Sequence, residues 1–494
     1  MSFLDHWILT FLLFLPAAGG AVVLVIRPPA AVRRTALGVA LGTFCISIFV
    51  LLLFHRQSDS AFDYAPAGSV QMHCSAELLP AIHLTYRVAV DALSLPFILL
   101  TSLVGVLACA LSWQDRDPPA SHFAMILWLE FTVLGVFISL DLLMLWSFLA
   151  LALIPCWVLL SVGGRQRVTR LFLLKELVGL ACLFVAALGV RLLSTRCFAG
   201  GTLDLVRLAS QPCADKTLYL LALIGFLVRL GTFPVHGWLI AVSRDRPPAT
   251  TAMLIGLIPL TGGYGLLRVV MPLFPVPAAS LWWVLAAVGV ITILYCSANA
   301  LGQEDAHVAT VQLAIAMTGF VCVGLAVLAP AGANGAAMIL LTQGLIAPFM
   351  VGISAVAERD ARESQVLPLS MTVCLAIAWL AELVVPGLLG QFMVLLGAFQ
   401  AHQSDSILIL EHATGPAAIG VLIAVVLAGI GLTGLAGVRI MRRLSRTDES
   451  PLAASSPGYL IPVAMTAILL GIFVAPFCLV FTRDAINTIL RTLR

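Results

Sequence analysis

Fourteen stretches of this chain are mostly apolar and about 20 residues long, and this pattern limits the fold more than any other feature. A helix of that length crosses the hydrocarbon core of a bilayer, which is about 30 Å thick. The stretches lie at about 7–26, 34–54, 91–113, 122–140, 142–163, 168–190, 217–240, 248–272, 279–301, 306–329, 334–356, 368–398, 415–437 and 458–482. Only 10% of the residues are charged, against about a quarter in soluble proteins. We therefore predict an all-α polytopic membrane protein with about 14 transmembrane helices.

The loops between these stretches set the orientation. Fifteen of the 27 Lys and Arg residues lie in one set of alternate loops, which the positive-inside rule places in the cytoplasm. An even number of spans puts both termini on the other side, so both are expected to face away from the cytoplasm, in a bacterial inner membrane. The chain begins MSFLDH, with an acid where a signal peptide has basic residues, so no cleaved signal is expected. A net charge of +3 gives no basic stripe for nucleic acid.

Two of the spans contain a proline near comparable places. Pro234 lies in RLGTFPVHGWL, and Pro386 lies in ELVVPGLLGQF. Proline removes a backbone donor and clashes with the preceding turn, so we predict broken helices 7 and 12. Paired broken helices indicate two inverted repeats around an ion or substrate path. The alternative is that both are ordinary proline kinks.

Arg229 lies just before the first of these breaks, in an apolar span. A charged residue at the centre of a membrane helix costs about 2.5 to 3.5 kcal/mol even on lenient scales, so it needs a counter-charge. The acids in nearby spans are Glu130 and Glu176, and either would serve. Lys175 is the only lysine in any span. It is adjacent to Glu176, about 100 degrees away around a helix, so we expect the two to pair poorly and one of them to face a neighbouring helix.

The stretch that follows carries a family pattern. TFPVHGWL is followed by PPATTAMLIGLIPLTGGYGLLRVVMPLFP at Pro247–Pro275, and VDALSLPFILLTS, LGVFISLDLLMLW and LIPCWVLL precede it. Together these motifs resemble the antiporter-like membrane subunits of respiratory complex I, most closely subunit M of NADH:quinone oxidoreductase. The resemblance implies fourteen helices over nearly the whole chain. It also implies helices 1–3 in 1–120, a first repeat of helices 4–8 in 121–275, a second of helices 9–13 in 276–445, and helix 14 with the tail in 446–494.

The family's proton-carrying residues are mostly missing at the matching positions. Ala150 stands at the glutamate position of helix five, and Leu260 at the lysine position of helix eight. Gln391 stands at an acidic position of helix twelve, and the helix-seven lysine is Arg229. A guanidinium stays charged in proteins and cannot relay a proton, so Arg229 is expected to be a fixed cation. It would either hold helices together with a glutamate and carbonyls freed at Pro234, or set the field near a residual proton path.

Three further polar residues complete the set of candidate intramembrane groups. Glu382 would either replace the acid missing at Gln391 or be a hydrogen-bonded structural carboxyl. His236 follows the break in helix seven and would either titrate near neutrality or be a satisfied structural histidine. His307 follows Glu304 and Asp305 near a helix start, where a solvated surface position is the default expectation.

The chain shows no sign of redox or metal chemistry of its own. It has no GxGxxG, no phosphate-binding loop and no iron–sulfur cysteine set, so no cofactor, metal or catalytic residue is expected in this chain. Most of the 11 cysteines lie in apolar runs and are expected to be small core residues. Cys197 and Cys213 flank one polar loop, where a disulfide is an open alternative.

These observations leave three hypotheses for function. The first is a membrane-arm subunit of a complex I type assembly, associated with proton translocation coupled to electron transport, with its own channel residues partly lost. It would be part of a quinone-reducing enzyme of the respiratory chain only by membership, with other membrane subunits and the lipid bilayer as partners and protons as the transported ion. The second is a cation/proton antiporter subunit. The third is the homologous subunit of a hydrogenase or inorganic-carbon uptake complex.

Overall fold

The structure is a computed structural model that describes residues 3–54, 71–79, 84–114, 119–161, 166–198, 201–364, 386–403 and 416–444. By the density of internal contacts, the chain falls into two compact units. The first unit is formed by Met1–Leu230, Leu260–Ala278 and Phe481–Arg494, and the second by Gly231–Pro259 and Ala279–Val480. The predicted span at 458–482 and the first part of the span at 368–398 lie outside the described residues. The expected domain boundaries at 120, 275 and 445 stay predictions.

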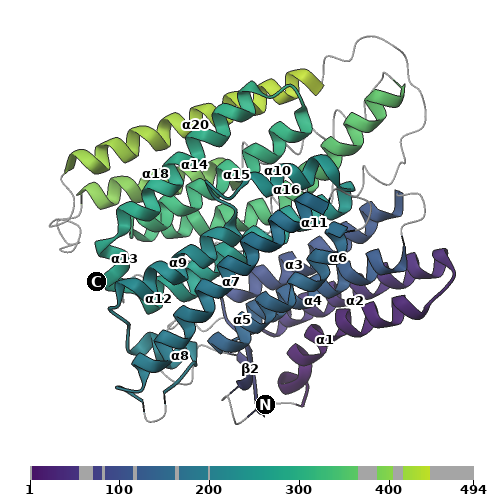
Figure 1. The fold of residues 1–494 in the computed structure, drawn as a ribbon, viewed down its shortest axis with the longest axis horizontal. Helices are drawn as coiled ribbons and strands as arrows, with labels where there is room; N and C mark the ends of the chain where they lie inside the picture. Colours follow the sequence, from purple (N-terminus) through teal and green to yellow (C-terminus); the bar gives the residue numbers. More distant parts are fainter. Residues whose placement is uncertain are drawn as a thin grey trace. The chain divides into compact units, whose positions relative to one another are not determined.

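Helices make up nearly all of the first unit (Figure 1). Its elements are α1 (Phe3–Val25), α2 (Pro29–Leu53), β1 (Gln71–Leu79), β2 (Leu84–Val90), α3 (Ser94–Leu111), η2 (Ser112–Gln114), α4 (Ala120–Ile138), α5 (Leu142–Leu151), α6 (Leu153–Ser161), α7 (Gln166–Ser194), α8 (Leu205–Ser210), α9 (Lys216–Leu230), the end of α11, a π-helical turn η3 (Leu266–Val270), α12 (Met271–Leu273) and α13 (Pro275–Ser280). The second unit contains α10 (Gly237–Asp245), most of α11 (Pro248–Gly265), α14 (Trp282–Gly302), α15 (Ala306–Ala326), α16 (Pro330–Ser364), α18 (Pro386–Gln403) and α20 (Pro416–Leu444).

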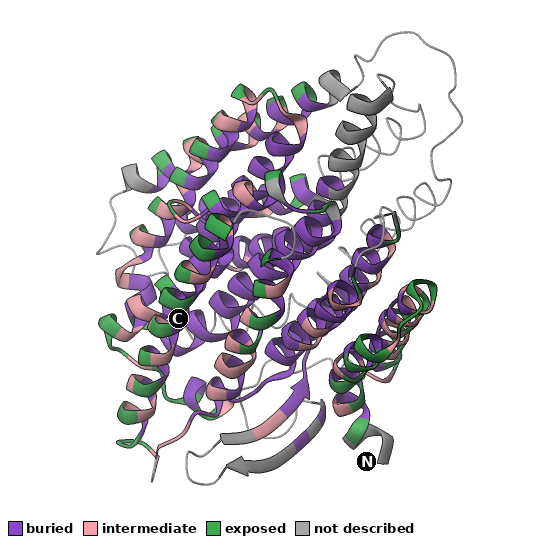
Figure 2. Ribbon diagram, turned by 45° about the vertical axis from the view of Figure 1, so that its right-hand side comes forward, coloured by how far each residue is buried: buried purple, intermediate pink, exposed green. Residues whose placement is uncertain are grey.

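Ten helical segments of the described chain are long and apolar enough to cross a membrane, which confirms the all-α polytopic class. Figure 2 shows that burial differs among them. Helices α3 and α4 are buried over most of their length, whereas α2 and α7 carry exposed apolar stripes. On α7 these exposed side chains include Leu171, Leu174 and Leu177. An apolar exposed stripe is what a lipid-facing helix requires.

Three features refine the expected helices. The span at 142–163 is interrupted at Ala152, so that α5 and α6 are separate helices. The span at 248–272 changes to π-helical geometry at η3. The third is an antiparallel pair of strands, β1 and β2, in the segment between α2 and α3.

Amino-terminal capping explains where several helices start. Asp141 caps α5 by accepting hydrogen bonds from the amides of Leu143 and Met144. Asp204 caps α8, and Asp305 caps α15 in the same way. Each carboxylate satisfies amides that have no partner within the helix. The acids of the loops are therefore used mainly to start helices.

Candidate functional site

The break predicted in helix seven is present. Helix α9 ends at Leu230, and Gly231 has a positive φ of 76°, a conformation that favours glycine. A turn through Pro234 follows, and α10 begins at Gly237. The side chain of Arg229 thus leaves the last turn of α9, one residue before the helix ends. At Pro386, α18 begins, but the residues before it lie outside the described chain, so the second break stays a prediction.

Arg229 is buried and paired with Glu176. Its side chain is 2% exposed and that of Glu176 is 1% exposed. The Nη1 atom of Arg229 donates to Oε2 of Glu176 at 2.9 Å. The sequence left Glu130 and Glu176 as alternative counter-charges, and the structure places Glu176 there. An ion pair this well buried needs close geometry and further hydrogen bonds to offset the loss of hydration.

Two further hydrogen bonds hold the guanidinium. Its Nε donates to Oγ1 of Thr261 on α11 at 3.0 Å, and its Nη1 donates to the carbonyl oxygen of Leu149 on α5 at 3.2 Å. Leu149 is adjacent to Ala150, and Thr261 is adjacent to Leu260, the two positions at which the family's glutamate and lysine are absent. Arg229 therefore joins α5, α7, α9 and α11 at the level of the missing residues. The carbonyl that it uses belongs to α5, three residues before the interruption at Ala152, and not to the break at Pro234.

Lys175 completes this group. The expectation that it would pair poorly with Glu176 was wrong, whereas the expectation that one of the two faces a neighbouring helix is confirmed by the bond between Glu176 and Arg229 of α9. Its Nζ atom donates to Oε1 of Glu176 at 2.6 Å and to the carbonyl oxygen of Val228 at 3.3 Å, and it lies 5.0 Å from the centroid of the Phe172 ring. Adjacent residues on a helix point in different directions, but the four-carbon lysine chain is long enough to curve back. We call Lys175, Glu176 and Arg229 the ion cluster. Two cations share one carboxylate, so its net charge is +1.

Glu130 has no part in the ion cluster. It lies in the middle of α4, fully buried, and neither carboxyl oxygen has a hydrogen-bond partner. Its carboxyl group lies against Gly105 of α3, where a Cβ atom added to the glycine would lie 2.6 Å from Oε2. Glu130 is thus a second intramembrane acid with surroundings unlike those of Glu176.

The two candidate histidines are both buried in the second unit. His236 packs against Phe233 and Tyr295, with ring centroids 5.9 and 5.4 Å away, and its Nδ1 has no hydrogen-bond partner. His307 is 5% exposed, and its Nε2 lies 3.1 Å from the carbonyl oxygen of Ser243 on α10. The expectation that His307 is solvated was wrong, because α15 is buried over its whole length and begins against α10.

The remaining candidates of the second half have simpler outcomes. Gln391 on α18 is 3% exposed and its Nε2 donates to the sulfur of Met317 at 3.1 Å. Glu382 lies outside the described residues. The role of either residue in proton movement stays a prediction.

One buried ion pair was missed from the sequence. Arg268 of η3 donates from Nη1 to Oδ2 of Asp91 at 2.5 Å, and both side chains are buried. Oδ1 of Asp91 accepts from the amides of Leu93 and Ser94, so the pair joins the start of α3 to the π-helical turn. The signal that would have found Asp91 is its position three residues before Ser94, a typical capping spacing. Nothing in the sequence alone links it to Arg268.

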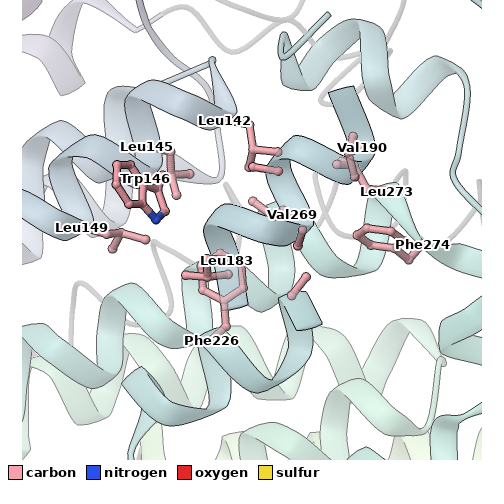
Figure 3. Close-up of a pocket in the computed structure, with 13 residues that line it drawn as sticks. Leu142, Leu145, Trp146, Leu149, Leu183, Val190, Phe226, Val269, Leu273 and Phe274 are labelled. Carbon is pink, nitrogen blue, oxygen red and sulfur yellow. The ribbon is translucent and has the colours of Figure 1, made fainter. Parts of the chain in front are cut away.

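An apolar cavity lies next to Leu149, whose carbonyl oxygen accepts from Arg229, and Figure 3 shows the residues that line it. Its volume is about 20 Å³, and it is lined by Leu142, Leu145, Trp146, Leu149, Leu183, Ala186, Ala187, Val190, Ala222, Phe226, Val269, Leu273 and Phe274. The indole nitrogen of Trp146 already donates to the carbonyl oxygen of Leu180 at 2.9 Å. Such a volume would hold about one water molecule, but a space without free polar partners stays dry. We therefore assign no proton path to this cavity.

The last candidate groups are the cysteines and the side chains that could bind a metal ion. Within the described ranges, no three His, Cys, Asp or Glu side chains are arranged to hold a metal ion. Cys197 is exposed and Cys213 is partly buried, and both are free thiols. Burial raises the pKa of the Cys213 thiol, against a backbone hydrogen bond at Asp215 that lowers it. Cys109, Cys156, Cys296 and Cys322 are buried as expected, whereas Cys45 is exposed on α2.

Comparisons with known proteins support one family. Residues 139–415 match the model of the family described as NADH:quinone oxidoreductase/Mrp antiporter, TM. The NAD(P)H-quinone oxidoreductase chain 4 2 of Thermosynechococcus vestitus is 32% identical over 404 residues, which cover 77% of this chain and 72% of that protein. A chain of respiratory complex I from Thermus thermophilus has the same fold, with a TM-score of 0.82, 21% identity, and 98% and 100% of the two chains covered. A chain of the Mrp complex from Dietzia sp. DQ12-45-1b also has it, with a TM-score of 0.74, 16% identity and full coverage of both. The chain is therefore a member of the NADH:quinone oxidoreductase/Mrp antiporter membrane family.

Proposed function

We propose that this protein is a membrane-arm subunit of a complex I type assembly, associated with proton translocation coupled to electron transport. The relative from Thermosynechococcus is by name a chain of an NAD(P)H-quinone oxidoreductase, which supports membership of such an assembly. The sequence offers no nucleotide motif and no cluster of iron–sulfur ligands. Substrate oxidation and quinone reduction would therefore belong to other subunits, and this chain would be a non-redox part of the enzyme.

The observation that carries this proposal is the ion cluster at the broken helix. A buried charge at mid-membrane is costly and is usually retained for function. Arg229 keeps the cation of helix seven, but as a guanidinium, which cannot release a proton. Its three hydrogen bonds reach α5, α7 and α11. In our proposal the subunit retains the scaffold of a proton channel, and the cluster holds its helices together without passing protons through Arg229.

The test is purification of the tagged chain in mild detergent from its own cells. Under this proposal it is recovered with subunits that carry flavin and iron–sulfur clusters, visible in the absorption spectrum and by peptide mass spectrometry. Recovery of the chain without such subunits, together with cation/proton exchange in vesicles that contain it alone, would overturn the proposal. We also propose that the chain resides in a bacterial inner membrane with both termini outside the cytoplasm.

One observation favours a second candidate, a subunit of a cation/proton antiporter. The chain shares its fold with a chain of an Mrp complex over its full length, and the family model covers both classes. Against this candidate, Ala150 and Leu260 stand where the family's helix-five glutamate and helix-eight lysine would be. The genes beside this one separate the candidates. Genes for antiporter subunits would favour a cation/proton antiporter, and genes for a hydrogenase or an inorganic-carbon uptake complex would favour membership of such a complex.

A further inference from the structure

Polar side chains gather on one face of α3, away from the ion cluster. Ser102, Gly105, Cys109 and Ser112 are spaced by three, four and three residues, so they share one side of the helix. Oγ of Ser102 lies 2.8 Å from Oγ of Ser47 on α2, within the first unit. Oγ of Ser112 lies 3.0 Å from Nε2 of His122 at the start of α4. Ser102 and Ser112 thus place two hydroxyl groups about 15 Å apart along α3 and the turn that follows it, with Gly105 and Cys109 between them.

The carboxyl group of Glu130 lies against the middle of this face. A Cβ atom added to Gly105 would lie 2.6 Å from Oε2, 2.7 Å from Cδ and 3.1 Å from Oε1 of Glu130. Two of these distances are shorter than real Cβ contacts, so a side chain at this position would require the flexible end of Glu130 to move. The absence of a side chain at Gly105 therefore leaves the space that the carboxyl occupies.

Among the described residues, no cation forms an ion pair with this carboxyl. Glu130 is fully buried, and both of its oxygens lack a hydrogen-bond partner. Helices α3, α5 and α6, which pack against α4, contain no charged residue. Three other elements contact α4, and their charged or titratable residues lie near their ends or are already paired. The charged residues of α2 are Arg33 and Arg34, both within its first two turns. Strand β2 has Arg87, which pairs with Asp204, and α1 has Asp5 and His6 near its start.

Two titratable side chains, Cys109 and His122, lie on α3 and α4. Cys109, one turn beyond Gly105 on α3, is fully buried. His122 lies eight residues from Glu130 on α4, about 12 Å along the helix. An ionised carboxylate without a partner in an apolar interior costs far more than the neutral acid. The surroundings of Glu130 therefore favour the protonated form.

We propose that Glu130 is a proton-holding site at mid-membrane, separate from the ion cluster, with Gly105 as the residue that makes room for it. Its ligand is a single proton on the carboxyl group. Glu176 provides a comparison within the same chain. Both acids are buried, but of the two only Glu176 is paired with cations in the described structure. The site does not depend on which complex the chain joins.

The test is modification of the protein in its own membranes with the apolar reagent dicyclohexylcarbodiimide. The O–H bond of a protonated carboxyl adds across one C=N bond of the reagent, so that oxygen bonds to carbon, the proton passes to nitrogen and nothing leaves. We expect the modified fraction at Glu130, measured by peptide mass spectrometry, to exceed that at Glu176 by at least about tenfold, because a paired carboxylate stays ionised. Equal modification of the two acids, or modification of Glu176 alone, would overturn the proposal.

Infrared spectroscopy supplies a second measurement that needs no reagent. The carbonyl stretch of a protonated carboxyl should be present in the native protein, shift on transfer to heavy water, and disappear in Glu130→Gln. In Gly105→Ala the added methyl group would displace the carboxyl, so the same band should move. A difference spectrum of native protein and Glu130→Gln without a protonated carbonyl band would refute the assignment, and Glu176→Gln is the matched control that should leave the band in place.

Discussion

Replacing Glu176 with glutamine tests the charge balance of the ion cluster most directly. The change keeps the size of the side chain and removes one negative charge. Both carboxyl oxygens are in use, Oε1 by Lys175 and Oε2 by Arg229. Without the carboxylate, two cations with side-chain exposures of 9% and 2% would remain with no acid between them. The cluster's net charge would rise from +1 to +2.

The expected cost follows from this geometry. Removing one partner of a fully buried ion pair destabilises a protein by about 3–5 kcal/mol, because the other charge is left uncompensated. Glu176→Gln strands two charges, so we expect a loss near the upper end of that range. Lys175→Met is the matched control, because it also removes one charge but leaves a neutral pair of Glu176 and Arg229. It should cost much less.

The measurement is the free energy of unfolding in mixed micelles titrated with a denaturing detergent. A double variant gives a second comparison. Adding Arg229→Met to Glu176→Gln removes one of the two unpaired cations. The double variant should therefore lose less unfolding free energy than the sum of the losses in the two single variants. We expect a coupling energy of about 0.5–3 kcal/mol. Equal losses for Glu176→Gln and Lys175→Met, or strictly additive losses in the double variant, would show that the cluster is not held by charge pairing.

Four further outcomes follow from the structure. Arg229→Met should lower the abundance of the assembled complex more than its turnover per complex; unchanged abundance with altered pumping stoichiometry would contradict a structural role. Gln391→Glu should still insert into the membrane, because the family holds an acid at that position, and protease protection of its loops is the measurement. Cys197, which is exposed, should react with an impermeant maleimide added outside intact cells, and labelling only after lysis would reverse the topology. Cys213 should react more slowly than Cys197 and faster as the pH rises, because burial raises the pKa of its thiol and only the thiolate reacts.

The sequence predicts the membrane class and the helix seven break because both follow from local rules. The apolar stretches are long enough to identify directly, and a proline such as Pro234 kinks or breaks a helix because it lacks an amide hydrogen and clashes with the preceding turn. The interruption between α5 and α6 has a similar local cause, which is also a proline. Pro155 lies one turn further on and removes the amide that would bond to the carbonyl of Leu151.

The partners within the candidate site depend on which helices pack together, and no local rule provides that. Glu130 and Glu176 are both acids in apolar spans, and only the packing of α7 against α9 brings Glu176 to Arg229. Lys175 was misjudged because an angle around a helix ignores how far a lysine side chain reaches. His307 was misjudged because a helix start was equated with a surface, whereas this one begins against α10.

The apolar cavity next to Leu149 has a consequence for the leakage of ions through the helix bundle. Its lining residues on α5 run from Leu149, whose carbonyl accepts from Arg229, to Leu142 in the first turn, a rise of about 10 Å. A hydrated ion passing between these side chains would lose its water without gaining a replacement ligand, and the idealised cost of moving an ion into such surroundings is of order 20 kcal/mol. The apolar lining therefore opposes ion movement between Arg229 and the start of α5.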